Sequence, residues 1–143
     1  MRRQLIKDLY PYNTTANISK KTTIRSMAEL IVNHPEIHFL SVVDTSDKLL
    51  GLISRKRLFQ AIFSHHVSAN SKITELYSLL TSEYAEDLLI KQVFTCNETD
   101  SLDKIINLMI NRGLEAVPVL NKAGKFSGLV TIERLLSKWL ETI

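Results

Sequence analysis

The stretch that decides the fold reads Gly51-Leu52-Ile53-Ser54-Arg55-Lys56-Arg57-Leu58. Its pattern returns 77 positions later (128 minus 51) as Gly128-Leu129-Val130-Thr131-Ile132-Glu133-Arg134-Leu135. In each copy a glycine opens a short apolar run, a hydroxyl residue follows, and an amphipathic segment comes next. This order is typical of a strand, a helix N-cap and a helix. The repeated stretch therefore predicts a duplicated structural unit.

The duplication extends well beyond this stretch. In each half, a segment with apolar side chains at helical spacing precedes an apolar, β-branched strand, a polar turn and a second strand. In the first half, the predicted helix lies at 24–33, the first strand at 39–43, the turn at 44–48 and the second strand at 49–53. In the second half, the same elements lie at 102–112, 116–120, 121–125 and 126–130. Short segments near residues 17–19 and 94–96 add a further strand to each half. Each half is therefore predicted to be a β-α-β-β-α unit.

These units predict an α+β protein with two domains. A unit of about 60 residues buries little of its surface alone, so we expect the two to pack sheet to sheet with pseudo-two-fold symmetry. The predicted division is a first unit at 1–70 that includes the N-terminal segment, a linker helix at 71–83 and a second unit at 84–143.

The gross properties of the chain exclude several classes of protein. Its 143 residues carry a net charge of +3, which is too small to indicate nucleic-acid binding. The apolar runs are too short to cross a membrane, and no signal peptide is seen. Cys96 is the only cysteine, which fits a reducing cytoplasm, and no zinc-binding set can be assembled around it. We therefore expect a cytoplasmic protein without a metal site.

Both halves resemble the CBS domain, and together they resemble its tandem pair, the Bateman module named after cystathionine beta-synthase. The residues that carry the resemblance are Ser41-Val42-Val43-Asp44 with Gly51-Leu52-Ile53-Ser54, and Val117-Pro118-Val119 with Gly128-Leu129-Val130-Thr131. The resemblance implies a regulatory module, not an enzyme. It also implies a cleft between the two units for an adenine nucleotide or an S-adenosyl ligand, with no cofactor required.

The resemblance also implies the residues of that site. In the family, the hydroxyl of a Gly-x-x-Ser/Thr-x-x-Asp pattern binds phosphate and the aspartate holds ribose. Ser54 and Thr131 match the hydroxyl, whereas Arg57 and Arg134 stand in place of the aspartate. By the same resemblance, Ile18 and Cys96 fall on the strand that lines the cleft.

The two arginines leave two interpretations open. Arginine has no acceptor atom, so it cannot accept hydrogen bonds from a ribose diol. In the first interpretation, the arginines and the two hydroxyls bind a phosphate-rich anion at the helix N-termini. In the second, Arg57 and Arg134 reach to water or pair with carboxylates such as Glu133, and the chain is a ligand-free dimerisation or protein-interaction module.

The final helix of each unit carries apolar side chains at equivalent positions, which are Phe59, Ile62 and Phe63, and Trp139 and Leu140. By resemblance to the family, such helices form a homodimer interface. We therefore expect a homodimer that binds a small-molecule nucleotide and acts on a regulated partner protein.

Overall fold

The computed structural model describes residues 3–13, 15–63, 82–90 and 93–142. The chain forms two compact units, each of which contains one repeat. The first-repeat unit comprises residues 15–92, and the second-repeat unit comprises residues 1–14 and 93–143. The predicted linker helix at 71–83 lies, apart from residues 82 and 83, outside the described residues.

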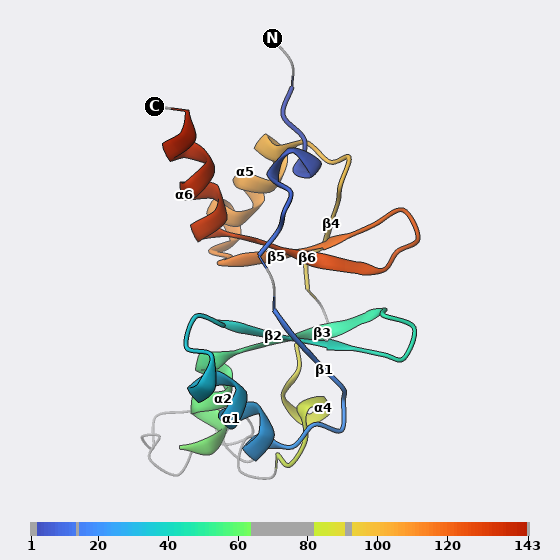
Figure 1. Ribbon diagram of the computed structural model, residues 1–143, viewed down its shortest axis with the longest axis vertical. Helices are drawn as coiled ribbons and strands as arrows, with labels where there is room; N and C mark the ends of the chain where they lie inside the picture. Colours follow the sequence, from blue (N-terminus) through green and yellow to red (C-terminus); the bar gives the residue numbers. More distant parts are fainter. Residues whose placement is uncertain (1–2, 14, 64–81, 91–92, 143) are drawn as a thin grey trace. The chain divides into compact units, whose positions relative to one another are not determined.

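The first-repeat unit has the predicted β-α-β-β-α order. A parallel pair and an antiparallel pair form its mixed three-stranded sheet, in the order β1-β2-β3. In Figure 1 its helices lie on the same face of this sheet. Its elements are β1 (Ala16–Ile18), α1 (Ile24–Asn33), β2 (Phe39–Val43), β3 (Leu49–Ser54), α2 (Arg55–Ile62) and the short α4 (Ala85–Leu88).

The second-repeat unit repeats this plan. Its mixed sheet has the strand order β4-β5-β6. The pairing register of its hairpin shifts directly after the Val119–Gly128 pair, and that of the first hairpin shifts directly after the equivalent Val42–Gly51 pair. Its elements are the 3₁₀ helix η1 (Ile6–Leu9), β4 (Cys96–Asn97), α5 (Leu102–Arg112), β5 (Ala116–Leu120), β6 (Phe126–Thr131) and α6 (Ile132–Glu141). The α+β class and the duplicated unit are thereby confirmed.

Local chemistry explains why the repeated elements begin and turn where they do. The hairpin turns are closed by Asp44 and Asn121, whose side-chain oxygens accept two backbone N–H bonds each. These bonds hold the pKa of the Asp44 carboxyl below its ordinary value. Asp47 and Gly124 take positive φ values of 62° and 77° in the same turns, which Asp and Gly tolerate better than most residues. The polar turns predicted from sequence are therefore formed.

Each unit encloses its own hydrophobic core between its sheet and its helices. The buried residues of the first-repeat unit are Ile18, Met27, Leu40, Val42, Ile53, Leu58, Ala85 and Leu88. Those of the second-repeat unit are Ile6, Leu9, Tyr12, Cys96, Leu102, Ile105, Met109, Val117, Val119 and Val130. Both cores therefore use residues from outside the repeated β-α-β-β-α segment.

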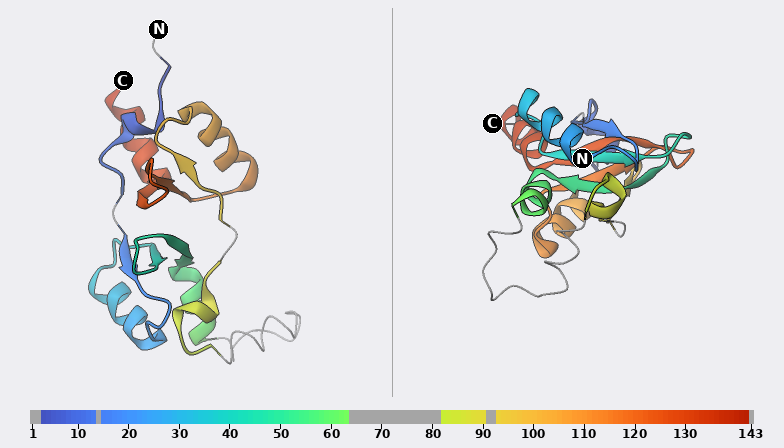
Figure 2. Two further views of the ribbon diagram at one scale, coloured as in Figure 1. Left: turned by 90° about the vertical axis from the view of Figure 1, so that its right-hand side faces the viewer. Right: turned by 90° about the horizontal axis from the view of Figure 1, so that it is seen from below.

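The N-terminal segment packs on the second repeat and the α4 segment packs on the first. Amide groups of Ile6 and Lys7 donate to carbonyl oxygens of Asp100 and Glu98, and η1 contacts α6. Figure 1 and the turned view in Figure 2 both show the dark-blue N-terminal segment against the orange and red elements, and the yellow α4 against the first repeat. The compact units therefore differ from the predicted division at 1–70 and 84–143, because the contacts of these segments are long-range.

No helix in the described part of the chain is long and apolar enough to span a membrane.

Candidate functional site

The two hydroxyls of the repeated stretch are helix caps. Ser54 Oγ accepts a hydrogen bond of 3.0 Å from the Arg57 amide, and Thr131 Oγ1 accepts one of 3.1 Å from the Arg134 amide. Each thereby satisfies one of the free N–H groups at the start of its helix. The strand, N-cap and helix predicted from the repeated stretch are all present.

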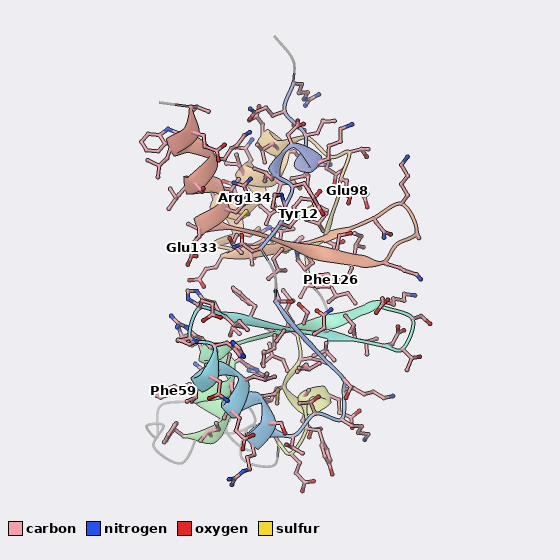
Figure 3. The ribbon with its side chains drawn as sticks, viewed as in Figure 1. Tyr12, Phe59, Glu98, Phe126, Glu133 and Arg134 are labelled. Carbon is pink, nitrogen blue, oxygen red and sulfur yellow. The ribbon has the colours of Figure 1, made fainter. Side chains whose placement is uncertain are left out.

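The two arginines hold the segment that packs onto their unit. Arg57 Nε donates to the carbonyl oxygen of Leu88 at 3.3 Å. Arg134 Nε donates to that of Leu9 at 3.0 Å and to that of Pro11 at 3.2 Å. Figure 3 shows Arg134 near Tyr12 of the N-terminal segment.

This contact accounts for an arginine at the position where the resemblance implies an aspartate. Leu88 and Leu9 are the last residues of α4 and η1, whose final carbonyl oxygens have no partner within their own helix. Arginine can donate to them, whereas an aspartate cannot. Neither of the two interpretations drawn from the sequence included this contact.

The two docking segments, 5–13 and 82–90, are equivalent to each other. In each, an aspartate accepts a backbone N–H bond from the residue three positions earlier, with Asp8 bonded to Leu5 and Asp87 bonded to Tyr84. The bonds from Glu83 and Tyr84 hold the pKa of the Asp87 carboxyl below its ordinary value. The spacing of these aspartates before Leu9 and Leu88 is a signal that could have identified the pair from sequence.

The glycine of the repeated stretch lies under the docking segment. A Cβ on Gly51 would come within 2.5 Å of the Ile90 carbonyl oxygen, and one on Gly128 within 2.8 Å of Tyr12 Cβ. Each glycine therefore allows the segment to approach the strand at a distance that a larger residue would prevent.

Ile18 and Cys96, expected to line a cleft, belong to the hydrophobic cores. Their exposed fractions are 7% and 2%. Burial, with a smaller contribution from Asp100, raises the pKa of the Cys96 thiol to about 12, so this thiol stays protonated at neutral pH. Among residues 3–13, 15–63, 82–90 and 93–142, no group of three His, Cys, Asp or Glu side chains is placed to hold a metal ion.

The first turn of α2 is strongly cationic. Arg55, Lys56 and Arg57 occupy it without an acidic residue, although the N-terminal end of a helix favours negative charge. Arg55 and Lys56 are exposed and Arg57 is half-buried. The corresponding turn of α6 contains Glu133, so the first-repeat unit offers the stronger attraction for an anion.

Comparisons with known proteins match this architecture. A family model described as the CBS domain matches residues 6–64 and 85–141. Homoserine O-acetyltransferase from Methanosphaera stadtmanae is 30% identical over 126 residues, which cover 88% of this chain and 22% of that protein. The chain spans about a fifth of the length of the first curated relatives it matches.

Solved structures share the fold. CBSX2 in complex with AMP has a TM-score of 0.78 at 19% identity, with 96% of this chain and 97% of that chain covered. The CBS domain pair of protein MJ0100, in complex with 5'-methylthioadenosine and S-adenosyl-L-methionine, has a TM-score of 0.76 at 20% identity, with 99% and 100% covered.

Proposed function

Since the chain belongs to the CBS domain family and carries two copies of the domain, we propose that it is a non-catalytic regulatory module that binds a nucleotide or another phosphate-bearing anion. The observation that carries this proposal is the cationic first turn of α2 beside the Ser54 hydroxyl. The known complexes of CBSX2 with AMP and of the MJ0100 pair with S-adenosyl ligands support the choice of ligand class. Binding would pass a signal to a regulated partner protein.

The physical argument is electrostatic. Each cation near a helix N-terminus costs about 0.3–1 kcal/mol when exposed, and Arg55, Lys56 and Arg57 share one turn. A phosphate at this turn would neutralise that repulsion and accept a hydrogen bond from the Ser54 hydroxyl. Arg57 Nε is engaged with the Leu88 carbonyl, but its terminal nitrogens carry further donors.

We expect nucleotide binding to weaken when this turn loses its hydroxyl or its charge. Ser54→Gly removes the hydroxyl but keeps a residue that is tolerated at an N-cap. Loss of one hydrogen bond to a charged group should weaken binding by about 10- to 100-fold, and Lys56→Gln should weaken it by a smaller factor that vanishes at high salt. Isothermal titration calorimetry with AMP, ATP and S-adenosylmethionine measures these affinities.

The matched control is Lys122→Gln, which removes an equally exposed lysine from the β5–β6 turn. This variant should bind as the wild type does. If none of the three ligands binds the wild type at millimolar concentration, the proposed function is wrong.

A second candidate function, homodimerisation or protein interaction without a ligand, is favoured by apolar surface on the closing helices. Phe59 on α2 is 62% exposed, and Trp139 and Leu140 on α6 are 60% and 63% exposed. Figure 3 shows Phe59 at the outer side of its unit. An apolar groove of about 480 Å³ adjoins α6, lined among others by Ile106, Ile110, Ile132 and Leu136. Burial of this surface in a homodimer would remove the apolar area from water.

We expect the double variant Trp139→Lys/Leu140→Lys to be monomeric, because two charges in a desolvated interface are costly. Light scattering after size-exclusion chromatography measures the mass. Val32→Lys, which places a charge on an apolar α1 side chain that is 76% exposed, serves as a control that should remain dimeric. A wild-type monomer at micromolar concentration would contradict the homodimer.

A further inference from the structure

The hydroxyl of the second repeat is already bonded by the N-terminal segment. Thr131 Oγ1 donates to Asn13 Oδ1 at 2.6 Å while it accepts from the Arg134 amide. A threonine hydroxyl has a single proton, so this proton is committed to the Asn13 carboxamide. An anion that needs the same proton would have to displace Asn13.

The backbone holds Asn13 in this position. Its amide donates to the Leu129 carbonyl oxygen at 3.1 Å, and its own carbonyl oxygen accepts from the Leu129 amide at 3.2 Å. Arg134 Nε adds bonds to the carbonyl oxygens of Leu9 and Pro11 in the same segment. The carboxamide is therefore placed by a segment with several attachments, and removal of the side chain alone leaves these attachments in place.

In the first repeat, no residue that the structure describes caps the hydroxyl in this way. Ile90 pairs with Leu52 as Asn13 pairs with Leu129, so Ile90 holds the equivalent position in this backbone pairing (90 minus 13 and 129 minus 52 both give 77). The short helices before them are 79 positions apart (88 minus 9), so the two segments differ in length between helix and bridge. Its aliphatic side chain can neither accept nor donate a hydrogen bond. Among the described residues, Ser54 Oγ is bonded to the Arg57 amide, for which it is the acceptor. None of the described residues therefore accepts its proton.

We propose that Asn13 acts as an intramolecular occupant of the second-repeat site, so that the chain binds one anion, at Ser54. This inference rests on the proposed function, and it adds the number of anions bound per chain and the residue at which the anion binds. The carboxamide oxygen carries partial negative charge and faces the Thr131 hydroxyl, so it both blocks and repels a phosphate at this position. The charges of the two helices also favour an anion at Ser54 over one at Thr131. Glu133 lies in the first turn of α6, whereas the first turn of α2 has no acidic residue.

Calorimetric titration of the full chain with ATP tests this inference. The wild type should bind one ATP per chain, and Asn13→Ala should bind two, with the second site within roughly tenfold of the first. Asn13→Asp is the matched control, because it keeps an acceptor beside Thr131 and should still bind one. Ser54→Gly should lose most of the wild-type binding, and the double variant Ser54→Gly/Asn13→Ala should bind one.

The outcomes separate the two proposals. Two equivalent sites in the wild type, or a single site in Asn13→Ala, would overturn the role of Asn13 and leave nucleotide binding intact. Binding by Asn13→Ala but not by the wild type would support the cap and overturn the site at Ser54. Binding by neither protein would overturn both proposals. Thermal melting of each variant without ATP shows whether it is folded.

Discussion

Replacement of Leu9 by alanine is expected to lower the free energy of unfolding by about 2–5 kcal/mol, as large-to-small changes in a well-packed core do. Leu9 lies in the N-terminal segment, outside the repeated β-α-β-β-α unit, yet its exposed fraction is 0%. It belongs to the core cluster that contains Val117, Val119 and Val130. The N-terminal segment is thus part of the second-repeat core.

The equivalent replacement in the first-repeat unit is Leu88→Ala, for which we expect a loss of the same size because Leu88 is also 0% exposed. Urea unfolding followed by circular dichroism measures both variants. Lys7→Ala is the matched control, since Lys7 is an exposed residue of the same short helix as Leu9, and it should change stability by less than about 0.5 kcal/mol. A similarly small change in Leu9→Ala would show that the segment does not dock.

Gly51→Ala is expected to destabilise the protein by about 1–3 kcal/mol, the usual range when atoms are forced into a filled space. The added Cβ would lie 2.5 Å from the Ile90 carbonyl oxygen and 2.8 Å from Leu89 Cδ1. The side-chain atom can move, but the carbonyl oxygen belongs to a backbone that is bonded to Leu52. The docking segment would therefore have to shift away from β3.

Gly128→Ala should cost at least as much, because Gly128 also has a φ of 148°, which side-chain-bearing residues rarely adopt. Chemical denaturation provides the measurement, and Ser127→Ala provides the control at an exposed neighbouring position. If Gly51→Ala matched Ser127→Ala in stability, the close approach of the segment to β3 would be refuted.

Much of the fold was predictable because its signals are local. The positions of α1 and α5 followed from apolar spacing, and those of the hairpins followed from polar turns between β-branched strands. The caps Ser54 and Thr131 each accept a hydrogen bond from the amide three residues ahead. Both partners of each bond therefore lie within one short stretch of sequence, where a motif can reveal them. Duplication strengthened these predictions, since each half supplied an independent copy of every signal.

The candidate site was only partly predictable, because its decisive contacts join distant residues. Arg134 bonds the carbonyl of Leu9 from 125 positions away, and Thr131 bonds Asn13 from 118 positions away. A local sequence pattern cannot reveal a bond between residues so far apart in the chain. Cys96 illustrates the same limit, since its strand was expected to line a cleft and the packing of the core decides that its thiol is buried.

The sequence by itself determined the duplicated β-α-β-β-α unit, its helix caps and its membership of the CBS domain family, because these depend on side-chain periodicity and on bonds within one turn. Only the tertiary structure decided which segment completes each core and why arginine replaces the expected aspartate. The physical reason is that a carbonyl oxygen at the end of a docking helix needs a donor, and the donor that reaches it lies 31 or 125 positions away in the chain. The same docking made the two hydroxyls of the repeated stretch different, because Thr131 is bonded to Asn13, whereas Ile90, which pairs with Leu52 as Asn13 pairs with Leu129, has no side-chain group that could bond Ser54.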